Sequence, residues 1–221
     1  MKMVLASHNA GKLAELHLLL EPLGLQLVCQ SDLGIGPAPE PHRTFVENAL
    51  AKARHAAAAS GLPALADDAG LCVDAFGGLP GVDTADYALQ FGYPKGDSGN
   101  VRALLEQMAH LQLPGERGAA LVSTLVAVRS AHDPEPLIAS GRVVGQIALQ
   151  AVGSNGFGFD PIMFIPAFGK TFAQLPDAVK NAHSHRGQAA QRMQRLMQER
   201  WGLGLGLVFA SDAPLPPVDA L

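Results

Sequence analysis

The sequence is poor in cysteine and has no long apolar run. Its two cysteines, Cys29 and Cys72, lie far apart among apolar neighbours, which argues against a disulfide framework and indicates buried thiols of a reducing compartment. No apolar run approaches the ~20 residues that span a bilayer. The run after Lys2 is too short for the core of a signal peptide. We therefore expect a cytoplasmic protein with no membrane partner.

Charge is also scarce, because charged residues make up 16% of the chain and the formal net charge is -4. A surface of this sign disfavours unspecific binding to nucleic acid, so no nucleic-acid partner is expected, although a local basic pocket is compatible with it. Apolar material is abundant. Hydrophobic residues make up 48% of 221 residues, enough for one large domain or for two small lobes that share a core.

The apolar pattern predicts strands and helices that interleave without an internal repeat. Strands are expected at residues 2–7, 25–31, 119–130 and 136–149, the last two as a hairpin, and helices at 12–24, 44–61, 99–111 and 184–201. Residues 62–78 are expected to form two short strands flanking an acidic turn, and residues 153–166 a glycine-rich loop that runs into a strand. This order predicts an α/β or α+β fold with a mixed sheet. Residues 202–221 are expected to be a loosely held, flexible tail.

The segment SHNAGK, residues 7–12, joins the first predicted strand to the first predicted helix. A strand that ends in small residues before a helix leaves free backbone N–H groups, which bind anions readily. Lys12 adds a charge suited to phosphate, and Ser7 and Asn9 add neutral hydrogen-bonding groups. The G-x-x-x-x-G-K-[ST] pattern of a P-loop is absent. On local evidence alone, a plain strand-to-helix turn made by Asn9 and Gly11 is the favoured interpretation.

Asp67 and Asp68 are adjacent within an apolar stretch. Two carboxylates near a core are unfavourable unless a metal or positive groups compensate them. On one strand they would point to opposite faces, whereas in a turn both could ligate Mg²⁺ and activate a water. A solvated acidic turn is the alternative. Asp74 is expected to be a local cap rather than a third ligand.

A further group of charged and polar residues that could contact a ligand comes before these acids in the sequence. Lys52 lies four residues after Asn48, so both share one helix face and Lys52 could reach a ligand there. Glu47 is expected to belong only to the capping box of Thr44. Glu40 stands alone in a proline-rich loop.

Two later segments could recognise a nucleobase. Phe157 and Phe159 lie between glycines and could stack on a base, although the local pattern favours core residues ahead of the turn former Asp160. The segment KNAHSHRGQ carries a cluster that could be a solvated helix start with Ser184 as N-cap: Lys180, His183, Ser184, His185 and Arg186. No cysteine or acid nearby completes a zinc set for the histidines. The Arg186 guanidinium could donate to the O6 and N7 acceptors of a keto-purine, where adenine presents an amino donor.

Taken in this order, these motifs resemble the inosine triphosphate pyrophosphatase family. The resemblance extends from Met1 to about Trp201 and runs through SHNAGK, TFVENALAKA, ALADDAGLCVDAFGGLPGV, GFGFDPIMF, GKTF and KNAHSHRGQA. It implies a single domain over residues 1–201, an elongated two-lobed α/β fold with a long mixed sheet, and an active site in the cleft between the lobes. It also implies a homodimer that hydrolyses deaminated purine nucleoside triphosphates to a monophosphate and pyrophosphate with Mg²⁺.

The resemblance also implies roles for individual residues. Ser7, Asn9 and Lys12 would hold the triphosphate, with Lys52 as a second cation. Glu40 and Asp68 would bind Mg²⁺, and either Asp67 or Asp68 would orient and deprotonate the attacking water. The base pocket would be formed by Phe157, Phe159, Asp160, Lys180, Ser184, His185 and Arg186.

The chain departs from the family pattern in three places. Asp86 stands where the family usually has Arg, Ala69 replaces the usual Ser after the paired acids, and the tail after Trp201 is longer than typical. None of these touches the acids or Lys12, so activity is expected to survive.

Two other functions are compatible with the residues. One is a sister pyrophosphatase that acts on other modified nucleotides, against which the SHRG segment argues. The other is a nucleotide-binding module without catalysis. Such a module could dispense with its carboxylates, whereas this chain keeps Glu40, Asp67 and Asp68 together with both lysines.

Overall fold

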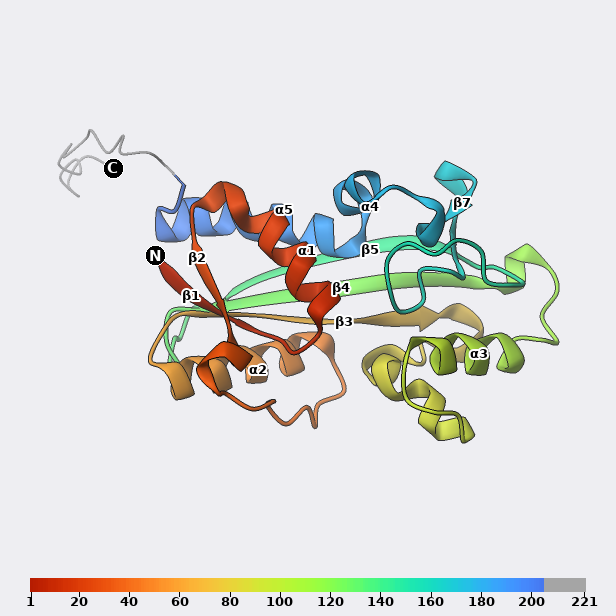
Figure 1. Cartoon of the computed structure of the whole chain (residues 1–221), viewed down its shortest axis with the longest axis horizontal. Coiled ribbons are helices and arrows are strands. Elements are labelled where there is room, and N and C mark those ends of the chain that lie inside the picture. Colours follow the sequence, from red (N-terminus) through yellow and green to blue (C-terminus); the bar gives the residue numbers. More distant parts are fainter. Residues whose placement is uncertain (205–221) are drawn as a thin grey trace, which may run out of the picture.

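The structure, a computed structural model, describes residues 1–204, and these form one seven-stranded mixed sheet covered by helices (Figure 1). The strands are β1 (Lys2–Ala6), β2 (Gln26–Cys29), β3 (Ala64–Val73), β4 (Gly118–Val128), β5 (Leu137–Ile147), β6 (Met163–Ile165) and β7 (Lys170–Thr171). The helices are α1 (Ala10–Leu20), α2 (Phe45–Ser60), α3 (Asp97–Gln107), α4 (Asp177–His183) and α5 (His185–Trp201). A long 3₁₀ segment, η4 (Gly81–Phe91), precedes α3.

The strand order is β2-β1-β3-β4-β5-β6-β7. β1 runs parallel to β2 and β3, and every later pair is antiparallel. The side chains of β1 and β3 point alternately to the two faces of the sheet, as successive side chains of a strand do. Met3 and Leu5 pack against α1 and α5 on one face, whereas Val4 and Ala6 pack against the alanines of α2 on the other.

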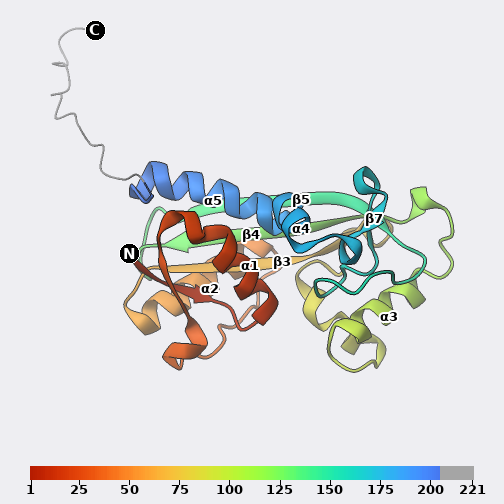
Figure 2. The ribbon, with the colours of Figure 1, turned by 45° about the horizontal axis from the view of Figure 1, so that its top comes forward.

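The molecule is elongated, with two lobes that share the long strands β3, β4 and β5. Helices α1, α2 and α5 surround one end of the sheet, and α3 and β7 lie at the other end in both views (Figures 1 and 2). The second lobe has its own apolar core, which includes Leu104, Ile162 and Phe172. The predicted fold class is therefore confirmed.

Most predicted elements are present, with shifted ends. Helix α2 starts after the N-cap Thr44, and Gly61 ends it with a φ of 68°; the predicted hairpin is β4–β5. The acidic turn predicted within residues 62–78 is wrong, because β3 continues through both acids without a break. Helix α4 and the segment η4 were not predicted. Across residues 1–204, every helix is too short or too polar to span a membrane.

Helix α5 ends at Trp201, the last residue of the predicted single domain. Gly202 caps α5 with a φ of 67°, and Leu203 packs against the core beneath that helix. The rest of the predicted tail, from residue 205 onward, lies outside the described residues.

Gly141 lets β5 approach the start of α5. A Cβ at this position would lie 2.7 Å from the backbone nitrogen of Ala189 and closer still to the carbonyl oxygen of His185. Because backbone cannot move aside as a flexible side chain can, we expect Gly141→Ala to destabilise the protein by about 1–3 kcal/mol. Chemical denaturation measures this loss. Gly115→Ala is the matched control, since a Cβ there meets nothing within 4 Å; equal stability of the two variants would contradict the prediction.

Candidate active site

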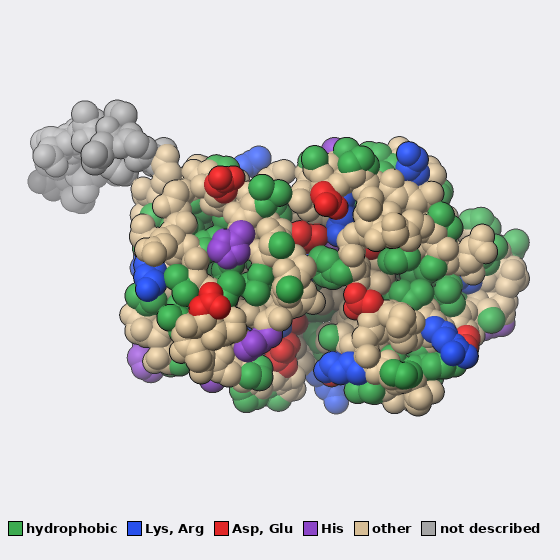
Figure 3. Space-filling model, viewed as in Figure 1, with side chains coloured by type: hydrophobic (Ala, Val, Ile, Leu, Met, Phe, Trp, Pro, Cys, Tyr) green, Lys and Arg blue, Asp and Glu red, His purple; other side chains and the backbone are tan. Residues whose placement is uncertain are grey.

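A cavity of about 520 Å³ lies between the two lobes and receives side chains from both. Figure 3 shows the surface hollowed between the two halves, with acidic and basic side chains gathered at the hollow. Of the residues predicted for the site, nearly all line this cavity: Ser7, Asn9, Lys12, Glu40, Lys52, Asp67, Asp68, Phe157, Phe159, Asp160, Lys180, His185 and Arg186. Segments more than a hundred residues apart in sequence thus meet in one place.

The segment SHNAGK forms a turn and also lines the cavity. Asn9 is the N-cap of α1, and its Oδ1 accepts a hydrogen bond from the backbone N–H of Lys12 at 3.0 Å. The Ser7 hydroxyl oxygen accepts from the backbone N–H of Asn9 at 3.2 Å. The start of α1 therefore faces the cavity with N–H groups of the kind that bind anions. The two interpretations of this segment, a turn and an anion site, are compatible.

Strand β3 separates the two adjacent acids. Asp67 points to the α1 and α5 side, where Lys12 Nζ lies 3.1 Å and Arg186 Nε 3.2 Å from its Oδ2, and the Ser123 hydroxyl donates to its Oδ1 at 2.6 Å. Asp68 points to the α2 side, where its Oδ1 lies 2.7 Å from Lys52 Nζ. No turn is needed to bring both to one site, because the cavity reaches both faces of the strand at this point.

Both carboxylate oxygens of Asp67 are engaged by neighbouring side chains, Oδ2 by Lys12 and Arg186 and Oδ1 by Ser123. Burial raises the pKa of the Asp67 carboxyl, but Lys12, Arg186 and the hydroxyl of Ser123 outweigh burial and hold this pKa well below its usual range. Asp68 differs in geometry, because its Oδ2 is buried and has no hydrogen-bond partner among the described residues. Of the two adjacent acids, Asp68 is therefore the one with an oxygen that no described residue engages.

Glu40 reaches the site because its loop is tied to α2. The side chain of Asn48 bonds both the N–H and the carbonyl of His42, each at 3.1 Å, and the ring of His55 bonds the carbonyl of Gly36 at 3.1 Å. Glu40 Oε2 then lies 2.7 Å from Lys52 Nζ. Burial lowers the pKa of Lys52, but Asp68 and Glu40 outweigh it, so that pKa is raised and the side chain stays an ammonium.

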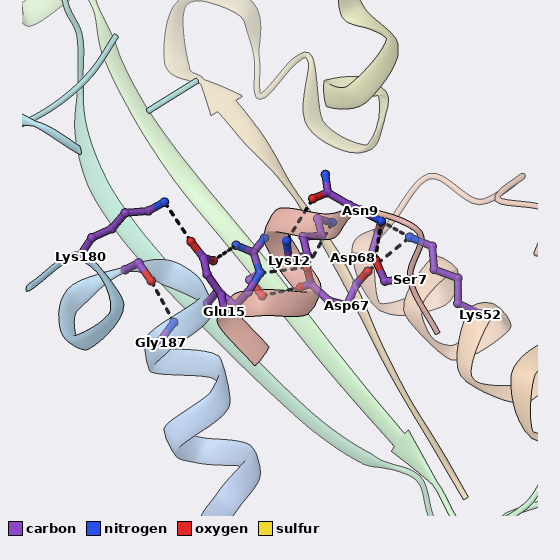
Figure 4. A network of polar contacts seen from close by, with 12 residues as sticks. Ser7, Asn9, Lys12, Glu15, Lys52, Asp67, Asp68, Lys180 and Gly187 are labelled. Atoms are coloured by element: carbon purple, nitrogen blue, oxygen red, sulfur yellow. Dashed lines mark hydrogen bonds and ion pairs between the residues drawn. The ribbon is translucent and has the colours of Figure 1, made fainter. Parts of the chain in front are cut away.

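At the opposite end, Glu15 joins the two cations of the predicted base pocket. Its Oε1 lies 2.9 Å from Lys180 Nζ (Figure 4). Its Oε2 lies 2.5 Å from Arg186 Nη1. Lys180 also contacts Asp160 Oδ2 at 2.6 Å. A continuous row of alternating charges thus runs along the cavity: Lys12, Asp67, Arg186, Glu15, Lys180 and Asp160. Sequence reasoning missed Glu15, although it lies three residues after Lys12 on the same helix face.

The two phenylalanines take different positions. The ring of Phe157 lies over Lys180 Nζ, 4.8 Å from the ring centroid, and over the guanidinium of Arg186 at 5.5 Å. A Cβ on Gly11 would lie 2.7 Å from this ring, so Phe157 and the start of α1 are in close contact. Phe159 lines the cavity but is mostly part of the second lobe's core. Phe157 is therefore the aromatic face that a ligand in the cavity could meet.

Ser184 and His185 differ in what they present to the cavity. Ser184 is the N-cap of α5, with its hydroxyl accepting from the N–H of Gly187 at 3.0 Å, and it does not line the cavity. The His185 ring is buried, and its Nδ1 has no partner within residues 1–204. Burial first, and then the positive charge of Arg186, keep the pKa of His185 well below its usual range, so the ring is neutral. A neutral imidazole can hydrogen-bond an uncharged ligand edge.

Other cavity residues were not predicted. His8 bonds the buried Gln30 through its Nδ1 at 2.7 Å, and Asp97, at the start of α3, accepts from the N–H of Gly158 at 2.7 Å. Both His8 and Asp97 line the cavity. His8 lies within SHNAGK, so its place beside Ser7 and Asn9 could have indicated it, whereas no motif surrounds Asp97 and only the fold brings that residue to the site.

The residues around Lys52 fit a divalent cation that a ligand helps to hold. Among the described residues no three His, Cys, Asp or Glu side chains gather into a metal site of their own. Glu40 and Asp68 supply two carboxylates with a free, buried oxygen on Asp68. Mg²⁺ is commonly bound through one or two carboxylates, with waters and substrate phosphates completing its shell. The donor set therefore suits Mg²⁺ bound together with a phosphorylated ligand.

Fold and cavity together define a two-lobed α/β protein with a charged site between its lobes. The model of the Ham1 family matches residues 3–196. The chain belongs to the Ham1 family, and the resemblance drawn from its motifs is confirmed.

Named relatives and solved structures agree with this assignment. A dITP/XTP pyrophosphatase of Polaromonas naphthalenivorans is 76% identical over 201 residues, which cover 91% of this chain and all of that protein. One of Albidiferax ferrireducens is 72% identical over the same shares. The structure of a HAM1 protein from Coxiella burnetii is 40% identical, with a TM-score of 0.82 over 90% of this chain and 99% of that one.

Proposed function

We propose that this protein is a nucleoside-triphosphate pyrophosphatase. It hydrolyses deaminated purine nucleotides (ITP, dITP, XTP and dXTP) to the monophosphate and pyrophosphate, and thereby removes non-standard bases from the nucleotide pool. The observation that carries the proposal is the free, buried Oδ2 of Asp68 in a cavity that also holds Lys12 and Lys52. Relatives named dITP/XTP pyrophosphatase that match more than nine-tenths of the chain support the substrate class.

The proposed mechanism assigns the triphosphate to the α1 end of the cavity. Ser7, Asn9 and the start of α1 orient the phosphates, while Lys12 and Lys52 offset their charge. Asp68 holds the attacking water and accepts its proton, since Asp67 has both oxygens engaged and is the weaker candidate for this role. Glu40 and Asp68 are proposed to hold Mg²⁺, which when bound offsets negative charge on the phosphoanhydride.

The base is assigned to the other end of the charged row. Arg186 uses Nε and Nη1 for Asp67 and Glu15, which leaves Nη2 for a ligand. A guanidinium donor matches the 6-keto group of hypoxanthine or xanthine and mismatches the 6-amino group of adenine. Unpaired buried polar groups can discriminate by orders of magnitude. Phe157 and His185 complete the proposed pocket with a stacking face and a neutral ring, next to Lys180, Asp160 and Phe159.

Two further properties belong to the proposal. We place the protein in the cytoplasm, where a reducing environment suits the free thiols of Cys29 and Cys72. We also propose a homodimer, on the strength of the family resemblance.

A product assay with four nucleotides tests the function. The protein is incubated with Mg²⁺ and inosine, xanthosine, guanosine or adenosine triphosphate, and the products are separated by ion-exchange chromatography. We expect pyrophosphate and monophosphate from the first two and little from the others. Orthophosphate from all four would indicate a different hydrolase. Binding of inosine triphosphate without turnover would instead favour a nucleotide-binding module.

A further inference from the structure

The ammonium of Lys52 lies between the two carboxylates assigned to the metal. Its Nζ is 2.7 Å from Glu40 Oε2 and 2.7 Å from Asp68 Oδ1, and it also reaches the carbonyl oxygen of Asp67 at 3.4 Å. The Lys52 side chain is 13% exposed and that of Asp68 is 7% exposed. Lys52 and Asp68 are thus held together in a largely dry place, where they interact strongly, while Glu40 reaches Lys52 from a more exposed position.

The ammonium compensates only part of the negative charge around it. One ammonium and two carboxylates leave this group with a net charge of −1. The partnerless Oδ2 of Asp68 belongs to the same group. The row that starts at Lys12 differs, because its three cations and three carboxylates balance. A divalent cation would therefore be attracted to the Lys52 group rather than to the row.

We infer that the Lys52 ammonium occupies the site of the divalent cation in the metal-free protein and is displaced when the cation binds. The inference rests on the proposed function, because it takes Glu40 and Asp68 as the ligands. Lysine suits this role, since its ammonium is a compact charge on a flexible four-carbon stem. Released from the carboxylates, Lys52 is free to turn toward the phosphates that enter with the metal.

The position of the Lys52 ammonium between the two carboxylates has two consequences. If neither the Lys52 ammonium nor a metal ion were present, Glu40, which is 46% exposed on its loop, would turn into water. Asp68 would then be left unpaired. Lys52 therefore keeps the two ligands together in advance. It also competes with the metal for both carboxylates, so the empty enzyme binds divalent cations more weakly than its two carboxylates alone would.

Binding of Mg²⁺ and Mn²⁺ to the nucleotide-free protein tests the inference without reference to activity. Isothermal titration calorimetry gives the affinity, and thermal unfolding with and without the metal gives the shift in Tm. We expect Lys52→Met to bind the metal on the order of tenfold more tightly than wild type, which corresponds to about 1.4 kcal/mol. Its Tm in EDTA should be lower, and its rise on adding metal larger. Lys52→Arg keeps a cation between the carboxylates and should stay near wild type in both measurements.

Two controls separate this inference from the proposed metal site. Lys95→Met removes another lysine that lines the cavity but pairs with the exposed Asp86 at 2.7 Å; its metal affinity should equal that of wild type. Asp68→Asn should abolish the metal response. A response that Asp68→Asn removes, but that Lys52→Met leaves unchanged or weakens, overturns the placeholder role alone. A wild-type response that Asp68→Asn leaves intact overturns the metal site, and the inference with it.

A measurement on the unaltered protein covers the case in which Lys52→Met does not fold. Brief acetylation followed by peptide mass spectrometry reports how freely each lysine reacts. Metal that displaces Lys52 should raise its acetylation several-fold, while Lys95 serves as the internal reference. Unchanged or lower reactivity of Lys52 at saturating metal would contradict displacement.

Discussion

Asp68→Asn is expected to fold normally and to lose pyrophosphate release by about 10²-fold or more, the scale of a lost general base. The amide keeps an oxygen for the contact with Lys52, which in the wild-type protein spans 2.7 Å, so the packing around β3 is retained. What disappears is the negative charge that would bind the cation and accept the proton of the attacking water. Steady-state release of pyrophosphate from inosine triphosphate measures the loss, and circular dichroism checks the fold.

Asp86→Asn is the matched control for Asp68→Asn. Asp86 is an acid of the same size that does not line the cavity. Among the described residues its ion-pair partner is the exposed Lys95. Its replacement should leave turnover within about twofold of wild type, since exposed pairs of this kind contribute little. Near-normal pyrophosphate release by Asp68→Asn would remove Asp68 from the mechanism.

Arg186→Met is expected to destabilise the protein by about 3–5 kcal/mol, the scale of breaking a buried ion pair from one side. The Arg186 side chain is 3% exposed, and its guanidinium bonds both Asp67 and Glu15. Methionine fills a similar volume but leaves two carboxylates short of a cation in the protein interior. Urea unfolding followed by circular dichroism measures the change.

Arg200→Met on the same helix provides the comparison. Arg200 pairs with Glu135 at 3.3 Å, and both side chains are more than half exposed. Its loss should change the stability by less than about 1 kcal/mol. Similar unfolding midpoints for the two variants would mean that the buried row of charges does not stabilise the fold. The double variant Arg186→Met with Glu15→Met should recover part of the loss, because one uncompensated carboxylate is removed.

Local pattern predicted much of this fold and most of its site. Thr44, the alanines between it and Gly61, and Gly61 itself predict helix α2. The runs of β-branched residues predict the hairpin of β4 and β5. These signals lie within the elements themselves. The continuity of β3 could not be predicted in the same way. Two adjacent acids in an apolar run indicate a turn unless both faces of the strand offer cations, and those cations come from α1, α2 and α5.

Glu15 was missed for a related reason. On its own helix it looks like an ordinary exposed acid, and its partners Lys180 and Arg186 lie 165 and 171 residues further along the chain. Only the packing of α1 beside α5, and of α4 against α5, brings them together. Ser184 shows the opposite case, because the cap predicted from local pattern is present and its hydroxyl is used by the helix.

The departures from the family pattern receive different accounts. The negative charge of Asp86 is balanced locally by Lys95, which comes from the loop before α3. Ala69 lines the cavity, and nothing in the structure explains the absence of a hydroxyl there.

The alternation of β3 has a consequence for how the protein can change. Asp67 and Asp68 are one peptide apart, yet Asp67 lies on the side proposed for the nucleobase and Asp68 on the side proposed for the metal. The strand acts as a partition, and its rise of about 3.3 Å per residue sets the offset between the two compartments. Loss or gain of one residue ahead of the pair would exchange the compartments of the two acids. A change in the length of β3 ahead of the pair would therefore displace both acids at once, which no single substitution does.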